Sequence, residues 1–238
     1  MTTQPFLIGE TMTGGYGRGP DILHDCTIAV NPGEIAVIVG PNGAGKSTAR
    51  KAIFGMLDVR SGRVTLDGDD ITALSPQDRV RRGMGFVPQV NNIFPSMSVE
   101  ENLEMGAFIR DDDFSSTMAQ VYDLFPILKD KRFQAAGELS GGQRQQVAVG
   151  RALMTQPKVL MLDEPTAGVS PIVMDELFDR IIEIARTGLP VLMVEQNARQ
   201  ALEIADRAYV LVQGANAHTG NGKSLLADPE VRRIFLGG

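Results

Sequence analysis

One glycine-rich octapeptide, residues 40–47 with the sequence GPNGAGKS, restricts the possible folds of this chain most strongly. It matches GxxxxGK(S/T), follows the apolar run 34–39 and precedes a helical pattern, which is the context of a phosphate-binding loop. Its glycines let successive backbone N–H groups face phosphate oxygens, and the helix dipole adds to the attraction. Lys46 is expected to reach the β- and γ-phosphates and Ser47 to bind Mg²⁺. The pattern therefore predicts a nucleotide site on an α/β sheet.

The rest of the chain supports a mostly parallel sheet. Residues 159–162, 191–194 and 209–212 are short apolar runs typical of strands that are buried on both faces. Helical patterns at 170–186 and 198–205 separate these runs. Strands that alternate with helices predict a parallel α/β core.

Two segments depart from this alternation. Up to about residue 75, alternating strands and a tight turn at Asp67-Gly68 predict a small antiparallel lobe. Residues from about 95 to 150 read as a helical subdomain, which begins near a capping box of Ser98 and Glu101. The apolar face expected there consists of Met118, Val121, Tyr122 and Phe125. We interpret residues 1–238 as one domain that contains this helical insert.

Composition narrows the function classes. The net charge of −6 argues weakly against a nucleic-acid partner, and we expect none. The arginines at 79, 81 and 82 are expected to form a solvated helix face. The single cysteine, Cys26, excludes an internal disulfide and is expected to be a small core residue. No apolar run approaches the roughly 20 residues of a spanning helix, and no secretory signal is evident, so a membrane role would work through a partner.

A pair of acidic residues is the second requirement of a nucleotide-hydrolysing site. The run at 159–162 ends in Asp163 and Glu164, and ligands of α/β sheets bind at the carboxyl edge of the strands. We expect Asp163 to hold the Mg²⁺ shell and Glu164 to act as the general base for the attacking water. A second glycine-rich segment, 220–224, lacks the leading glycine of the phosphate loop, and we interpret it as a hairpin loop.

A phosphate loop and an acidic strand also fit GTPases, kinases and helicases. The sequence LSGGQ at residues 139–143 distinguishes between these classes. It resembles the signature of the ABC ATPases. In that family the segment, here Ser140, Gly141, Gly142 and Gln143, faces the ATP held by a second cassette. The resemblance covers essentially the whole chain.

This resemblance implies further site residues. Tyr16 is expected to stack on adenine, and Gln89 to contact Mg²⁺ and face a membrane partner. Residues 167–171 occupy the segment that crosses the dimer interface, in an uncommon form. The family's usual histidine at the γ-phosphate is replaced by Gln196, which offers hydrogen bonds but no titratable charge. The residues expected at ATP are Tyr16, Gly40, Pro41, Asn42, Gly43, Ala44, Gly45, Lys46, Ser47 and Thr48.

Three segments narrow the resemblance to one group. VEQN at 194–197, FPSMSVEENLEMG at 94–106 and the ending FLGG are similar to the second ATPase subunit of branched-chain amino-acid uptake systems. Residues 90–93 are less typical of that group, so related systems for urea or short amides stay open. The resemblance implies a second ATPase subunit, two membrane permeases, an indirect soluble binding protein and a place at the cytoplasmic face of the inner membrane. Phe94, Pro95 and Met97 are expected either to contact the permease or to lie in the core of the insert.

Three other classes are weaker alternatives. A soluble ABC ATPase of DNA repair or translation generally carries two cassettes or a long coiled-coil insertion, and the chain has neither. A GTPase would need an NKxD motif, which does not occur. A scaffold that binds nucleotide without hydrolysis is disfavoured by the intact Glu164.

Overall fold

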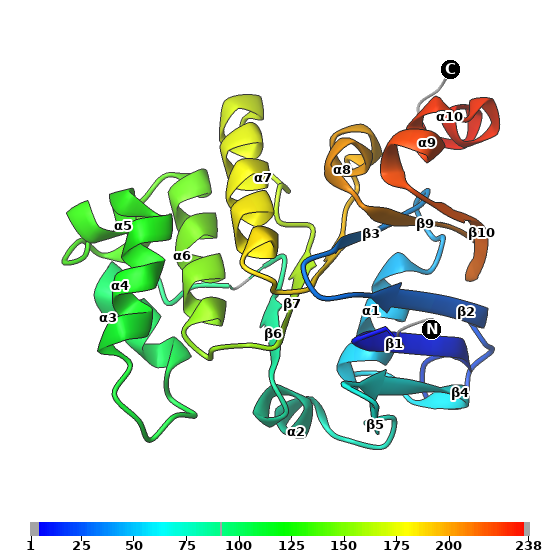
Figure 1. Ribbon diagram of the computed structural model, residues 1–238, viewed down its shortest axis with the longest axis horizontal. Coiled ribbons are helices and arrows are strands. Elements are labelled where there is room, and N and C mark those ends of the chain that lie inside the picture. Colours follow the sequence, from blue (N-terminus) through cyan, green and yellow to red (C-terminus); the bar gives the residue numbers. More distant parts are fainter. Residues whose placement is uncertain (1–4, 91, 236–238) are drawn as a thin grey trace.

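The computed structural model describes residues 5–90 and 92–235 and contains two sheets, shown in Figure 1. The larger sheet has the order β10-β9-β3-β8-β7-β6. All of its neighbouring strands are parallel except β10, which pairs with β9 in the antiparallel sense. Its strands are β3 (Ile35–Val39), β6 (Met84–Val87), β7 (Val159–Asp163), β8 (Val191–Val194), β9 (Arg207–Val212) and β10 (Ala215–Gly220). The predicted parallel sheet is confirmed.

The smaller sheet is antiparallel and has the order β2-β1-β4-β5. The predicted N-terminal lobe is thereby confirmed, and the turn at Asp67-Gly68 joins β4 to β5. Its strands are β1 (Leu7–Gly14), β2 (Leu23–Val30), β4 (Val59–Leu66) and β5 (Asp69–Asp70). The strands of this lobe are not consecutive in sequence, because β3, which lies between β2 and β4 along the chain, belongs to the larger sheet.

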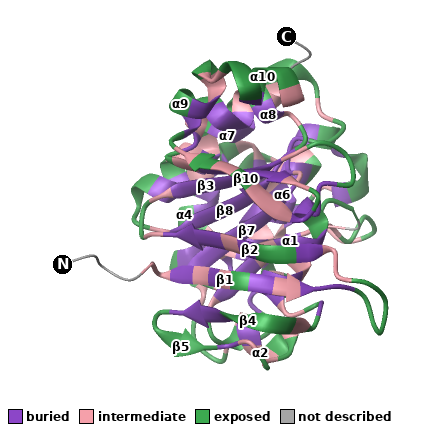
Figure 2. Ribbon diagram, turned by 90° about the vertical axis from the view of Figure 1, so that its right-hand side faces the viewer, coloured by how far each residue is buried: buried purple, intermediate pink, exposed green. Residues whose placement is uncertain are grey.

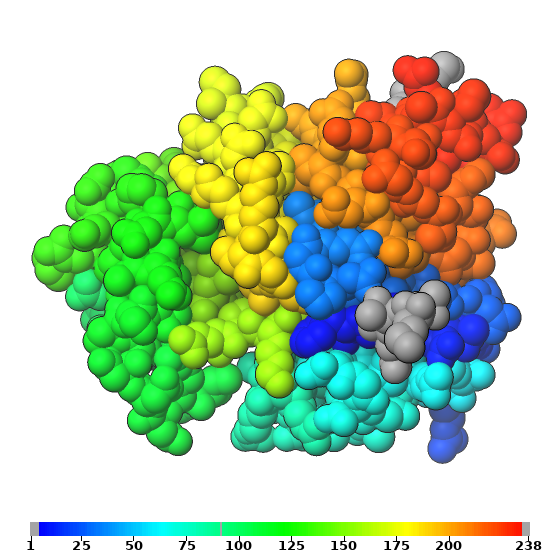
Figure 3. Space-filling view, viewed as in Figure 1, coloured from blue at the N-terminus to red at the C-terminus, as the bar shows by residue number. Residues whose placement is uncertain are grey.

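The helices divide between the sheets and a separate group, the helical lobe, which lies at the left of Figure 1. In the space-filling view, a notch separates the lower part of this lobe from the teal segment that contains α2 (Pro76–Arg81) (Figure 3). The lobe contains α3 (Val99–Gly106), α4 (Ser115–Leu124), α5 (Pro126–Asp130), a short 3-10 turn (Ala136–Glu138) and α6 (Gly141–Leu153). The other helices are α1 (Lys46–Phe54), α2 (Pro76–Arg81), α7 (Pro171–Arg186), α8 (Ala198–Ile204), α9 (Gly222–Ala227) and α10 (Pro229–Phe235).

Strand β3 shows how the sequence builds two cores. All of its residues are buried, and alternate side chains enter opposite clusters because the strand period is two. Val37 belongs to the cluster that includes the helical lobe and α7, whereas Ile38 belongs to the cluster that includes α1 and the antiparallel sheet. Figure 2 shows the resulting buried layers. Tyr209 further ties the sheets together, since its hydroxyl exchanges hydrogen bonds with the backbone of Ala29.

Helix and turn predictions agree with the structure in most places. The capping box of Ser98 and Glu101 is present at the start of α3. Val121, Tyr122 and Phe125 are buried, and Met118 packs partly buried against the same core. Cys26 is buried, as predicted.

Two predictions were wrong. Residues 220–224 do not form a hairpin loop, because β10 ends at Gly220 and the Asn221 side chain caps α9, accepting hydrogen bonds from two backbone N–H groups. Arg79 is not on a solvated face: it is 1% exposed, and its guanidinium donates hydrogen bonds to four backbone carbonyls. Arg81 and Arg82 are exposed, as expected, and pair with nearby aspartates.

Candidate functional site

The phosphate loop lies between the carboxyl end of β3 and the first turn of α1. Gly43 and Gly45 have φ angles of 79° and 97°, which is the left-handed region that favours glycine. Lys46 Nζ lies inside the loop and donates hydrogen bonds to the Gly40 carbonyl at 2.6 Å and the Pro41 carbonyl at 3.2 Å. Burial lowers the pKa of Lys46, and the charge of Glu164 opposes that shift. A buried ammonium group therefore stands against the backbone of the glycine-rich loop.

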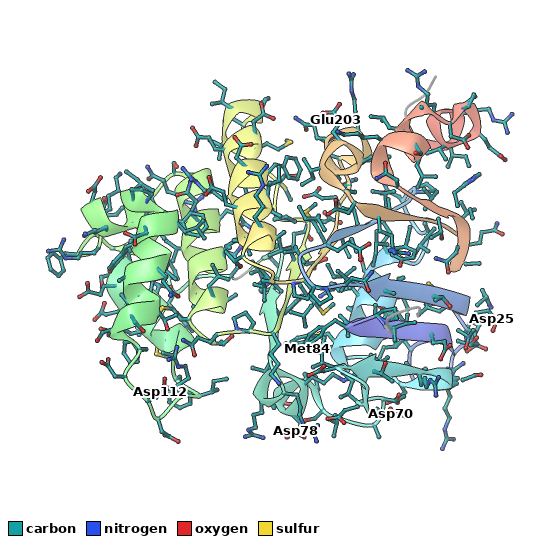
Figure 4. The ribbon with its side chains drawn as sticks, in the orientation of Figure 1. Asp25, Asp70, Asp78, Met84, Asp112 and Glu203 are labelled. Atoms are coloured by element: carbon teal, nitrogen blue, oxygen red, sulfur yellow. The ribbon has the colours of Figure 1, made fainter. Side chains whose placement is uncertain are left out.

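The two acidic residues occupy different environments at the end of β7. Asp163 is the last residue of the strand and is 8% exposed, and burial raises its pKa against the opposing charge of Arg50. Glu164 turns out of the strand with a φ of 46°, which is uncommon for a residue with a side chain. Its Oε2 accepts a hydrogen bond from Gln89 Nε2 at 2.8 Å. Five labelled acids, by contrast, lie at the periphery of the molecule: Asp25, Asp70, Asp78, Asp112 and Glu203 (Figure 4).

Gln196 follows β8 and faces the phosphate loop. Its Nε2 lies 3.4 Å from Asn42 Oδ1, at the long end of hydrogen-bond range. A cleft of about 270 Å³ contains Glu164 and Gln196, together with Thr166, Ala167, Met174, Glu195 and Asn197. The expected general base and the expected histidine replacement therefore line one cavity.

Sequence reasoning missed Glu195, which organises this cleft. It is 1% exposed and accepts four hydrogen bonds. Thr166 donates to Oε1 from its N–H and its hydroxyl, while the N–H groups of Gln196 and Asn197 face Oε2. The only sequence signal was a charged residue that continues an apolar strand. Glu195 joins the segment that carries Gln196 to the loop that follows Glu164.

Tyr16 lies beside α1 on the loop between β1 and β2. Lys51 Nζ donates a hydrogen bond to its hydroxyl at 3.2 Å and lies 4.9 Å from the ring centroid. The ring is 46% exposed, so a face is free to stack on a planar ligand. Burial alone would raise the pKa of Tyr16, but hydrogen bonds with Lys51 and Thr48 lower it on balance.

The LSGGQ segment is not part of this cluster. Ser140 caps α6 in the helical lobe, and its capping box with Gln143 is complete. Within residues 5–90 and 92–235, no hydrogen bond joins residues 140–143 to the phosphate loop. Gly141 instead lies near Gly168, in the segment expected to cross a dimer interface. The structure thus brings together Tyr16, the phosphate loop, Gln89, the two acids and Gln196, and leaves the signature segment apart.

Phe94, Pro95 and Met97 do not lie in the core of the helical lobe. Phe94 is 41% exposed, Pro95 is exposed and Met97 is half-buried. The buried amide of Asn102 holds their loop. Its Oδ1 accepts a hydrogen bond from the N–H of Phe94, and its Nδ2 donates to the carbonyls of Phe94 and Met97. In the part of the chain that the structure describes, no helix has the length and apolar character of a membrane span.

The sequence of this chain matches a family model and several known transport proteins. The ABC transporter family model matches residues 23–167. A high-affinity branched-chain amino acid transport ATP-binding protein, BraG of Pseudomonas aeruginosa, is 44% identical over 94% of this chain and 96% of its own length. A probable branched-chain amino acid transport ATP-binding protein, LivF of Archaeoglobus fulgidus, is 42% identical over 95% and 96%. A lipopolysaccharide export system ATP-binding protein, LptB of Escherichia coli, is 38% identical over 97% of each chain.

Solved structures of ATP-binding cassettes have the same fold as this chain. The crystal structure of the ADP conformation of an ATP-binding cassette of an ABC transporter superposes with a TM-score of 0.89 at 31% identity, covering 99% of this chain and 100% of that one. A nucleotide-free cassette from an ABC transporter gives a TM-score of 0.86, also at 31% identity, over 99% and 100%. With fold, phosphate loop and sequence in agreement, this chain belongs to the ABC transporter ATPases, the cassettes that bind and hydrolyse ATP.

Proposed function

We propose that this chain is the ATP-hydrolysing subunit of an importer for branched-chain amino acids. The observation that carries the catalytic part is the convergence of Lys46, Glu164 and Gln196 at the carboxyl edge of three neighbouring parallel strands. The cargo part rests on the two relatives whose names specify branched-chain amino acid transport, both above 40% identity across nearly the whole chain.

In this proposal each side chain has one task. Lys46 leaves its two carbonyl partners to bind the β- and γ-phosphates, while backbone N–H groups of residues 40–48 hold the remaining oxygens. Tyr16 stacks on the adenine. Glu164 accepts the proton of the attacking water, after Gln89 releases its carboxylate. Gln196 orients the γ-phosphate or the water through its amide.

The residues present also fit a Mg²⁺ ion. Ser47 offers a hydroxyl, Asp163 a carboxylate and Gln89 an amide oxygen, because the hydrogen bond of Gln89 to Glu164 uses only its nitrogen. Mg²⁺ prefers oxygen ligands and is usually bound by one or two carboxylates together with substrate phosphates. When bound, the ion would neutralise charge on the β- and γ-phosphates.

The isolated signature segment implies a partner. Ser140 Oγ accepts the N–H of Gln143, which leaves its hydroxyl proton free to donate to an anion. Because the chain's own phosphate loop lies elsewhere, that anion is proposed to be the γ-phosphate on a second ATPase subunit. ABC import ATPases act with membrane permeases. We propose two permeases here, contacted through Gln89 and the exposed Phe94 at the cytoplasmic face of the inner membrane, with a soluble binding protein acting indirectly.

The test is uptake of labelled leucine by source cells that lack this chain and are complemented with variants. Wild type and the exposed-site control Glu203→Gln are expected to restore uptake, and Glu164→Gln is not, because an amide cannot accept the water proton. Co-expression with the two proposed permease partners should bring the chain into the membrane fraction.

Two results would change the proposal. Full uptake with Glu164→Gln would refute its role as the base. Leucine uptake that never depends on the chain would refute the cargo assignment, and labelled urea and short amides would then be tested in the same cells.

A further inference from the structure

Arg50 places a buried positive charge beside the proposed metal ligand. It lies on α1, one turn after Lys46, and is 8% exposed. Its Nε is 3.1 Å from Asp163 Oδ1, and its guanidinium carbon is 5.2 Å from the centroid of the Phe86 ring. The guanidinium therefore lies between the carboxylate at the end of β7 and an aromatic ring on β6.

A second buried arginine, Arg79, differs from Arg50 in how its charge is satisfied. The guanidinium of Arg79 donates hydrogen bonds to four carbonyls, which satisfies a buried cation. In the described part of the chain, by contrast, Arg50 Nε has no aligned hydrogen-bond partner. The short distance to Asp163 is thus a contact between charges with poor hydrogen-bond alignment.

This contact has a consequence for any cation that approaches Asp163. A buried charge is costly unless an opposite charge offsets it, so Arg50 and Asp163 stabilise each other while no other cation is present. A metal ion that shares the carboxylate meets the resident guanidinium, and like charges repel strongly where water is partly excluded. The same guanidinium holds the carboxylate in place.

We propose that Arg50 is a positioning residue which holds Asp163 as a resident countercharge and lowers the affinity of the nucleotide-loaded site for Mg²⁺. This proposal rests on the role given above to Asp163. Its chemistry is competition between two cations for one carboxylate.

The experiment measures binding of Mn²⁺, a paramagnetic substitute for Mg²⁺, to the full chain loaded with ADP, by electron paramagnetic resonance. Arg50→Met removes the charge with similar length, and we expect Mn²⁺ to bind about tenfold more tightly, the order expected for removing a neighbouring unit charge. Arg50→Lys keeps the charge and should stay within about twofold of wild type. Arg82→Met, at an exposed pair with Asp69, is the control for a general change in charge.

The outcomes separate this proposal from the assignment of Asp163. If Asp163→Asn binds Mn²⁺ as tightly as wild type, both fail. If Asp163→Asn weakens binding but Arg50→Met leaves it unchanged or weaker, only the countercharge role fails. Arg50→Gln, a second neutral variant with a polar end, provides the same comparison should Arg50→Met not fold.

Discussion

Glu195 offers the sharpest test of how the cleft that contains Glu164 and Gln196 is held together. Its carboxylate is almost fully buried and accepts hydrogen bonds from both sides, from Thr166 on the β7 side and from the backbone of Gln196 and Asn197. Glu195→Gln preserves the shape but replaces one oxygen with an NH₂ group. Whichever way the amide turns, that group faces N–H or O–H donors, so at least one side of the connection is lost.

The magnitude follows from these contacts. A hydrogen bond to a charged group contributes about 1.5–3 kcal/mol, and the substitution removes two on one oxygen. Part of this loss is recovered, because burial raises the pKa of Glu195 and so shows that its charge is costly. We expect a net loss of about 2 kcal/mol in the free energy of unfolding, or about 4–8 °C in Tm for a domain of this size. Thr166→Val, which removes only the hydroxyl, should cost about 1 kcal/mol.

Urea and thermal denaturation of the isolated chain provide the assay. Glu203→Gln is the matched control on the neighbouring helix, where the glutamate makes an exposed pair with Arg199 at 3.4 Å. It should change the free energy of unfolding by less than about 0.5 kcal/mol. If Glu195→Gln also stays within about 0.5 kcal/mol of wild type, the four hydrogen bonds do not stabilise the cleft and the reasoning is refuted.

Three other expectations follow from single residues. Arg79→Met removes the donor of four hydrogen bonds to carbonyls and should cost about 3 kcal/mol in chemical denaturation, whereas Arg82→Met should cost less than about 0.5 kcal/mol; equal effects would contradict this. Burial raises the pKa of Cys26 to about 12, so iodoacetamide at pH 8 should label the urea-unfolded chain and spare the folded one. Because this folded pKa lies above the ordinary 9.0, the thiol's contribution to stability should be lost as pH rises from 9.0 to about 12. Gln196→His introduces an imidazole that titrates near neutrality, and ATPase activity of the assembled transporter should fall steeply between about pH 7.5 and 6; an unchanged profile would count against a γ-phosphate contact at this position.

Local sequence patterns predicted the sheets well because strand burial is encoded in consecutive residues. The expected strand 191–194 matches β8 in full, and the runs at 34–39 and 159–162 differ from β3 and β7 by one residue. The start of β9 was placed two residues late, because the strand begins with the charged Arg207 and the small Ala208 ahead of the large apolar residues. Arg207 keeps its charge at the strand end through a 2.7 Å pair with Glu34, which no local pattern reveals.

Buried charges were the main failure, and the reason is the distance of their partners along the chain. Arg79 looked like one of three solvated arginines, but two of its acceptors, the carbonyls of Ala52 and Ile53, end a helix more than twenty residues earlier. Arg50 on α1 meets Asp163 at the end of β7, and Glu195, which follows β8, meets Thr166 in the loop after the neighbouring β7. In a hydropathy pattern each of these residues is only a polar position among apolar ones. The partner that offsets each buried charge is visible only in the folded chain.

The placement of the signature segment shows how far a motif can be interpreted without its partner. Gly142, in the first turn of α6, lies against α7, where an added Cβ would overlap the Val173 side chain, so only glycine permits this approach. The approach joins the signature segment to the first turn of α7, and Gly141 also lies near Gly168. The two segments expected to face a second cassette therefore lie close together, and Ala167 of the second one also lines the cleft that contains Glu164 and Gln196. In this proposal hydrolysis needs the phosphate loop of one chain and the signature segment of another. A single chain therefore carries one half of each of two sites.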